Sequence, residues 1–165
     1  MFRWIDAKFL HRPRTYLLQA FLAGTALVAI LVVEDVLTNG IIVAAIASSV
    51  AVVFFAPHSV ASSPFRIVGD HLSGVAAGLC TVGILLLLPD SVQANEWVIH
   101  VLQGTALALV ILIMTVTNTE HTPAAGTALG LSTSIPGDSV IFIVSAALII
   151  ATVRAVLYRH LHNLM

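Results

Sequence analysis

Residues 118–135, NTEHTPAAGTALGLSTSI, decide how many times this chain crosses a membrane. Their apolar part, residues 123–135, would span about 20 Å as a helix, less than the roughly 30 Å hydrocarbon core of a bilayer. A segment this short crosses only where other helices shield it or where it lines a polar space. If it crosses, the chain has six spans, and if it does not, the chain has five.

The composition of the whole chain is that of an integral membrane protein. Of its 165 residues, 59% are hydrophobic and 9% are charged, whereas about a quarter of the residues in a soluble domain are charged. The net charge of −1 gives no indication of a nucleic-acid partner. The single cysteine excludes an intrachain disulfide. Because the length allows about one domain, we expect residues 1–165 to form a single transmembrane domain.

Four apolar runs are long enough to cross a bilayer as helices, and two are short. The long runs are residues 16–37, 67–88, 96–117 and 139–158. The short runs are residues 41–56 and 123–135. Linkers containing Pro, Gly, Asn or Ser separate them. We therefore predict an all-α membrane protein of about six transmembrane helices, two of them short.

The distribution of charge favours six spans over five. With six spans and a cytoplasmic start, the inside segments are residues 1–15, 57–66, 118–122 and 159–165. The seven basic residues lie in these segments or within two turns of them: Arg3, Lys8, Arg12, Arg14, Arg66, Arg154 and Arg159. The outside turns carry only acidic charges: Glu34, Asp35, Asp90, Glu96 and Asp138. This positive-inside pattern predicts a multi-pass protein of the cell membrane with both termini in the cytoplasm.

The six spans divide into two halves, residues 16–88 and 96–160, that both read long, short, long. Because each half has an odd number of spans, the halves would insert in opposite senses and form a 3+3 inverted repeat. Gly40 and Gly126 open the two short segments, and short spans at matching places indicate a transport site between them. Small-x-x-x-small patterns predict close helix packing: Gly74 with Gly78, Gly126 with Gly130, and Ala20 with Gly24.

The stretch before the second short span supplies the first candidate site. Thr122 and Pro123 suit the N-cap and first position of a helix, so we expect free backbone N–H groups at Ala124 and Ala125. Such a helix start attracts anions through its donors and its dipole. The alternative is that the Thr-Pro pair only starts a helix.

Neighbouring side chains add to this anion site. The small residues Gly126 and Thr127 would let an anion approach the backbone, although they would equally allow close packing. His121 supplies a hydrogen-bond donor whose charge can change. Glu120 is a candidate for gating or proton transfer, because ionisable groups at membrane depth are functional candidates by default.

Residues 57–71 supply the second candidate site, and within them Ser63 and Pro64 again suit the N-cap and first position of a helix. Arg66 and Asp70 are four residues apart, so we expect them to pair on one helix face, with Arg66 attracting anions and Asp70 gating or carrying protons. His71 follows inside a span, His58 lies in the linker, and Ser48 lies in the first short span. For Arg66 the alternative is a plain positive-inside anchor.

A metal site built from these histidines and acidic residues is a further alternative. No HExxH, CxxC or HxxxH spacing supports it. The segments assigned to the inside are too short to hold a soluble catalytic domain. We therefore predict no catalytic residue, no metal and no cofactor.

Both polar stretches resemble the HPP family of integral membrane proteins, which is named for a His-Pro-Pro motif followed by Ala, Gly and Thr. Residues 121–127, HTPAAGT, stand in that place, with Thr122 instead of the first proline. The family's Ala-Pro-His-Ser, Pro-Arg and Gly-x-His elements resemble APHS at 56–59, PFR at 64–66 and GDH at 69–71. Residues 45–49, AIASS, lack the glycine usual in the first short span, so the chain resembles a divergent member.

Members of the HPP family have been linked to nitrite transport. The resemblance therefore implies a transporter or channel for a small inorganic anion, with nitrite as the leading candidate. We expect a small anion and the lipid bilayer as partners, no nucleic acid, and, by analogy with other small channels, a homo-oligomer. Two alternatives remain: a non-transporting membrane scaffold or partner subunit, and a His-ligated metal or redox protein.

Overall fold

The fold is known from a computed structural model, which describes residues 7–34, 40–132 and 137–164. In these ranges the chain forms eight α-helices and one 3-10 helix and has no strand, so the all-α prediction is confirmed. The helices are α1 (Ala7–His11), α2 (Pro13–Glu34), α3 (Gly40–Phe55), η1 (Val60–Ser62), α4 (Pro64–Leu86), α5 (Asp90–Gln93), α6 (Glu96–Thr117), α7 (Ala124–Leu131) and α8 (Ser139–Leu157).

The predicted order of long and short helices is confirmed. Helices α2, α4, α6 and α8 are long and apolar enough to cross a membrane. Helices α3 and α7 are shorter, with 16 and 8 residues. The last three residues of the predicted second short span, 133–135, lie outside the described ranges, as do Arg3 and Asp35.

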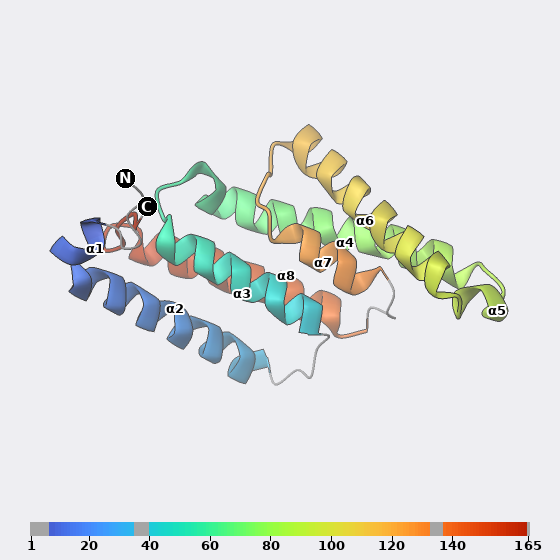
Figure 1. The fold of residues 1–165 in the computed structure, drawn as a ribbon, viewed down its shortest axis with the longest axis horizontal. Helices are drawn as coiled ribbons and strands as arrows, with labels where there is room; N and C mark the ends of the chain where they lie inside the picture. Colours follow the sequence, from blue (N-terminus) through green and yellow to red (C-terminus); the bar gives the residue numbers. More distant parts are fainter. Residues whose placement is uncertain (1–6, 35–39, 133–136, 165) are drawn as a thin grey trace.

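Helix α4 is at the centre of the bundle. It packs against α6, α7 and α8, while α3 packs against α2, α7 and α8. Within the membrane-spanning window of each helix, 56% of α4 is buried but only 22% of α6 and 11% of α2. Helices α2 and α6 therefore lie on the outside of the bundle, with α3, α4, α7 and α8 between them (Figure 1).

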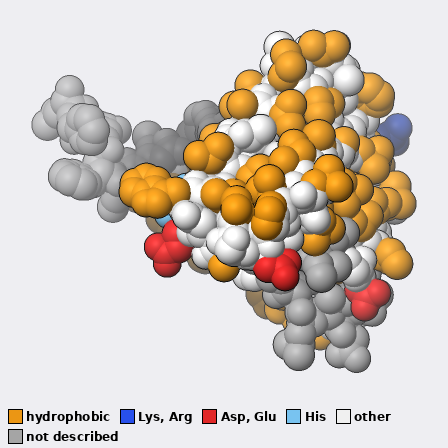
Figure 2. All heavy atoms as spheres, turned by 90° about the vertical axis from the view of Figure 1, so that its right-hand side faces the viewer, with side chains coloured by type: hydrophobic (Ala, Val, Ile, Leu, Met, Phe, Trp, Pro, Cys, Tyr) orange, Lys and Arg blue, Asp and Glu red, His pale blue; other side chains and the backbone are white. Residues whose placement is uncertain are grey.

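The interior holds two apolar clusters. The larger one lies where α3, α4 and α8 meet, and it includes Ile42, Ile46, Ile67, Phe142 and Ile143. The smaller one lies between α4, α6 and α7, and it includes Ala77, Ala106, Val110, Ala124 and Ala128. Large apolar side chains also cover the outer helix faces. Many apolar side chains are also exposed at the end of the bundle that Figure 2 shows, among backbone and other side chains. Since a bilayer solvates apolar side chains, the outer helix faces are suited to lipid.

Glycines allow the central helices to approach closely. A Cβ on Gly78 of α4 would lie 2.5 Å from the Cβ of Leu131 on α7, and one on Gly126 of α7 would lie 2.9 Å from the Cβ of Ala45 on α3. The predicted close packing is confirmed for these two helices. It is wrong for Gly24 of α2, where an added Cβ would meet nothing within 4 Å.

The two described ends of the chain lie at the same end of the bundle (Figure 1). The side chain of Gln19 on α2 donates to the carbonyls of Phe54 and His162. The backbone N–H of Leu164 donates to the carbonyl of Phe55 at 2.8 Å. The start of α2, the end of α3 and the C-terminal residues are therefore held together.

Candidate functional site

Five polar residues meet in the interior between α3, α4 and α7. Asp70 and His71 come from the second turn of α4, Ser49 from α3, Thr127 from α7, and His121 from the segment that connects α6 to α7. Each is at most 1% exposed. Because ionisable groups are costly at membrane depth, a cluster like this is a functional candidate.

Four of these side chains form a continuous hydrogen-bonded chain. The ring of His71 contacts the hydroxyl of Thr127 through Nδ1 and that of Ser49 through Nε2, both at 2.8 Å. The Ser49 hydroxyl also lies 3.2 Å from Nε2 of His121. Hydroxyls and imidazoles both donate and accept, so a chain of this kind can reverse its direction when a proton moves.

Asp70 is the one side chain of the cluster that no other described side chain hydrogen-bonds. Neither of its carboxyl oxygens has a partner of ordinary hydrogen-bond geometry among the described residues, and the same holds for Nδ1 of His121. The backbone N–H groups of His71 and Ala124 interact with the carboxylate. Nε2 of His121 lies 4.0 Å from Oδ2 of Asp70, beyond hydrogen-bond distance. Burial of an unpaired carboxylate costs several kcal/mol. Asp70 is therefore suited to take up a proton or to face a bound ligand.

The linker before α4 fixes the position of Asp70 and His71. The hydroxyl of Ser62 donates to the carbonyl of Ala56 at 2.7 Å, and that of Ser59 accepts from the Ser62 N–H. Ser63 is the N-cap of α4 and Pro64 its first residue, as the sequence predicts. Asp70 follows almost two turns later and points into the bundle.

The predicted anion site at the start of α7 needs a correction. Helix α7 begins at Ala124 with Pro123 as its cap residue, and no side chain caps it. The N–H groups of Ala124 and Ala125 donate to the carbonyls of His121 and Thr122 at 3.3 and 3.2 Å. The prediction that these N–H groups are free is wrong, because the preceding turn already supplies acceptors. Any anion binding here depends on side chains.

The predicted pair of Arg66 and Asp70 is also wrong. The guanidinium of Arg66 instead pairs with the carboxylate of Glu120 and donates to Oδ1 of Asn118 at 2.6 Å. Asn118 ends α6 in the left-handed conformation with a φ of 56°. The side chain of Glu120 is 48% exposed. Arg66 and Glu120 therefore neutralise each other at the surface, outside the buried cluster.

Two other candidate residues lie away from the cluster. His58 is exposed at the end of the bundle. The centroid of its ring lies 4.6 Å from that of Tyr158, in an edge-to-face arrangement. Ser48 is exposed and donates to the carbonyl of Ala44. With Thr122 and Gly126 it lines a surface hollow of about 340 Å³ between α3 and α7.

Ser49 is the residue of the cluster that sequence reasoning missed. It follows Ser48 directly, and α3 is apolar on every side. No polar face therefore shows which serine points inward. Among the described residues, no group of three or more His, Cys, Asp or Glu side chains is placed to hold a metal ion.

The family comparison identifies the chain. The model of the HPP transmembrane region matches residues 10–164. The chain belongs to the HPP family. No curated protein and no solved structure matches it. Membership of the HPP family makes the protein a multi-pass integral membrane protein, and that family is associated with membrane transport.

Proposed function

We propose that this HPP-family protein transports a small monovalent anion, with nitrite as the leading candidate. The observation that carries the proposal is the buried chain of Thr127, His71, Ser49 and His121 between the two short helices. Its hydroxyls and ring nitrogens are donors that suit a small anion. Transport sites commonly lie between short or interrupted helices of two repeats.

Asp70 gives this site a requirement for protons. An ionised carboxylate beside the chain would repel an anion, whereas a protonated one would donate a hydrogen bond to it. We therefore propose that the anion moves together with a proton carried by Asp70. The proton would pass to the hydrogen-bonded chain through His121, once its Nε2 and the Asp70 carboxyl close their 4.0 Å separation to hydrogen-bond distance. No covalent chemistry is required, so the proposed activity is transport and not an enzymatic reaction.

The helix contacts support the 3+3 inverted repeat. If α2, α3 and α4 are exchanged with α6, α7 and α8, the same pairs of helices are in contact. Helix α2 packs on α3 as α6 packs on α7, and α4 packs on α7 as α8 packs on α3, but the contact of α8 with α2 is slight beside that of α4 with α6. The contact of α3 with α7 and that of α4 with α8 are each left unchanged by this exchange. Alternating access around a central site is the usual use of such a repeat.

Charge supports the proposed orientation, with both termini in the cytoplasm of a cell. Figure 2 shows acidic side chains at the end of the bundle opposite the termini, where Asp90, Glu96 and Asp138 are exposed. Arg12, Arg14 and Arg159 lie at the other end and are exposed. This is the asymmetry that the positive-inside rule describes.

The test is flux into proteoliposomes that contain the purified protein. We expect nitrite uptake above that of empty liposomes, competition by nitrate or formate, and acceleration by an inward proton gradient. If neither nitrite nor nitrate, formate or chloride enters faster than into empty liposomes, the proposal is wrong. The exposed pair of Arg66 and Glu120 would then favour the scaffold alternative, which places Glu120 at the headgroups.

A cation is the second candidate substrate, because an unpaired buried carboxylate is the kind of group that binds one. The same liposomes loaded with dyes for sodium, potassium and divalent cations distinguish the two substrate classes. The proposed homo-oligomer is tested separately, by the mass of the purified protein in detergent.

A further inference from the structure

Two hollows lined by basic residues lie at the end of the bundle that holds the described termini. The first has a volume of about 440 Å³, and its lining includes His11, Arg12 and His162. The second has a volume of about 260 Å³ and includes Arg14 and His160. Thr15 and His162 line both, so the hollows adjoin. Neither lining contains an aspartate or glutamate among the described residues.

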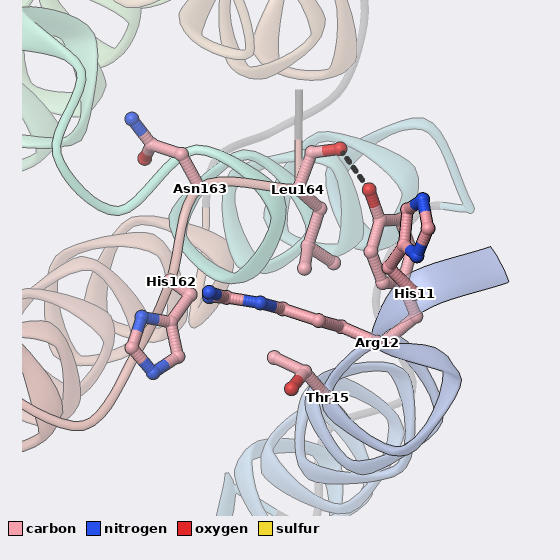
Figure 3. Close-up of a pocket in the computed structure, with 7 residues that line it drawn as sticks. His11, Arg12, Thr15, His162, Asn163 and Leu164 are labelled. Atoms are coloured by element: carbon pink, nitrogen blue, oxygen red, sulfur yellow. Dashed lines mark hydrogen bonds between the residues drawn. The ribbon is translucent and has the colours of Figure 1, made fainter. Parts of the chain in front are cut away.

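The walls of the first hollow are held by hydrogen bonds. The hydroxyl of Tyr16 donates to the carbonyl of Leu164 at 2.8 Å, and the side chain of Arg12 extends across the hollow toward His162 (Figure 3). The backbone N–H of His162 donates to Oε1 of Gln19 at 2.9 Å, and its carbonyl accepts from Nε2 of the same side chain at 2.9 Å. These contacts fix the C-terminal residues against α2.

The second hollow continues along the apolar part of the bundle. Leu18 and Leu22 of α2 and Leu157 of α8 line it. On the neighbouring face of α2, Leu17 and Phe21 are 65% and 70% exposed, as expected for side chains that face lipid. The second hollow thus combines basic residues with an apolar groove formed by Leu18, Leu22 and Leu157.

We propose that the two hollows together bind one anionic phospholipid. Arg12, Arg14 and His162 would contact the phosphate, and an acyl chain would lie along Leu18, Leu22 and Leu157. Positive-inside residues that serve only to orient a protein need no concave walls, whereas these residues line adjoining hollows, and within the described part of the chain no aspartate or glutamate pairs with them. Basic pockets beside transmembrane helices are known to bind anionic lipid headgroups. The apolar groove favours an intact lipid over free phosphate.

The experiment titrates the purified full-length protein in detergent with short-chain phosphatidylglycerol, phosphatidylcholine, glycerol phosphate or inorganic phosphate. Native mass spectrometry gives the bound fraction, and thermal unfolding gives the stabilisation. We expect phosphatidylglycerol to bind and stabilise, and the other three to do so at least tenfold more weakly. The double variant Arg12→Gln/Arg14→Gln should weaken phosphatidylglycerol binding about thirtyfold, as expected for the loss of two basic residues near an anionic headgroup.

The control variant is Arg159→Gln, which removes an exposed arginine that lines neither hollow. It should bind phosphatidylglycerol as the wild type does, and Arg12→Lys/Arg14→Lys should restore most of the binding. Equal binding of phosphatidylcholine would overturn the proposal, as would an unchanged affinity of the double glutamine variant. Equal stabilisation by inorganic phosphate would show a site for free anions instead. If the glutamine variant fails to fold, the comparison of the four ligands on the wild type still decides.

Discussion

Helices α4 and α8 are the third helices of the two halves, and they differ in what they bury. The buried side of α4 includes Asp70, His71, Ser73 and Thr81. The buried side of α8 is apolar: Phe142, Ile143, Ala146, Ala147, Ile150 and Ala151. The two helices hold corresponding places in the contacts of the bundle. In the proposed inverted repeat, two helices in corresponding places would therefore differ in that only α4 buries ionisable side chains.

The two short helices are more alike in what they contribute. Each brings one hydroxyl to the ring of His71, Ser49 from α3 and Thr127 from α7, both at 2.8 Å. Together they hold the ring on its two sides, one from each proposed half. In the proposed inverted repeat, motion of one half against the other would change the contact of His71 with Thr127, because Ser49 and His71 belong to the same half and Thr127 to the other.

Asp70 is the buried acidic residue that distinguishes α4 from α8, and its substitution is expected to have the largest effect on transport. Asp70→Asn keeps the shape but removes the proton, so proton-driven nitrite uptake into proteoliposomes should fall about a hundredfold. Asp70→Leu removes the unpaired buried carboxyl, so it should also raise the free energy of unfolding in detergent, by about 1–3 kcal/mol. Glu120→Gln is the control and should leave uptake within about twofold. Full proton-driven uptake by Asp70→Asn would remove Asp70 from the mechanism.

The close approach of α4 to α7 gives the next effect, on stability. A Cβ on Gly78 would lie 2.5 Å from Leu131, so Gly78→Ala should lower the free energy of unfolding by about 2 kcal/mol. Gly83→Ala in the same helix meets nothing within 4 Å and should change it by less than about 1 kcal/mol. Thermal unfolding of both variants in one detergent is the measurement. Equal stability of the two would mean that α4 and α7 are not packed this closely.

Most of the fold could be predicted from the sequence, because a bilayer imposes simple rules. The thickness of its core sets the lengths of the long helices, and Glu96–Thr117 is the same in prediction and structure. The capping pair Ser63 and Pro64 sets the start of α4, again as predicted. These are local or one-dimensional features, so no tertiary knowledge is needed.

The candidate site could be predicted only in part, because it depends on tertiary contacts. The sequence names His71, His121 and Asp70 as candidates from their type and depth. It names Thr127 only as a small residue near a helix start. The partner of Arg66 is a residue 54 positions away. Spacing within one helix cannot reveal such a partner. Which side of α3 faces the interior could not be predicted either, because a helix that is apolar all round has no polar face to distinguish its sides.

Substitution of the two adjacent serines of α3 tests which side of this helix faces the site. Ser49→Ala removes the hydroxyl that bridges the two histidines, so nitrite uptake should fall about tenfold, as expected for the loss of a buried hydrogen bond. Ser48→Ala removes an exposed hydroxyl bonded within its own helix and should leave uptake unchanged. Uptake by the purified variants in matched proteoliposomes decides between them. A larger loss for Ser48→Ala would move the site to the surface hollow with Thr122 and Gly126.

The smallest effect is expected for Arg66 of α4 and its partner Glu120, which lie outside the buried cluster. Their side chains are 16% and 48% exposed, so solvent screens the pair and its coupling energy should be about 0.5 kcal/mol. A double-mutant cycle of Arg66→Gln and Glu120→Gln, read by thermal unfolding, measures it. The same variants should retain nitrite uptake, since the pair neutralises itself away from His71. If Arg66→Gln abolishes uptake while Glu120→Gln does not, Arg66 attracts the anion. Helix α4 would then contribute a residue near the surface to transport, in addition to its buried residues.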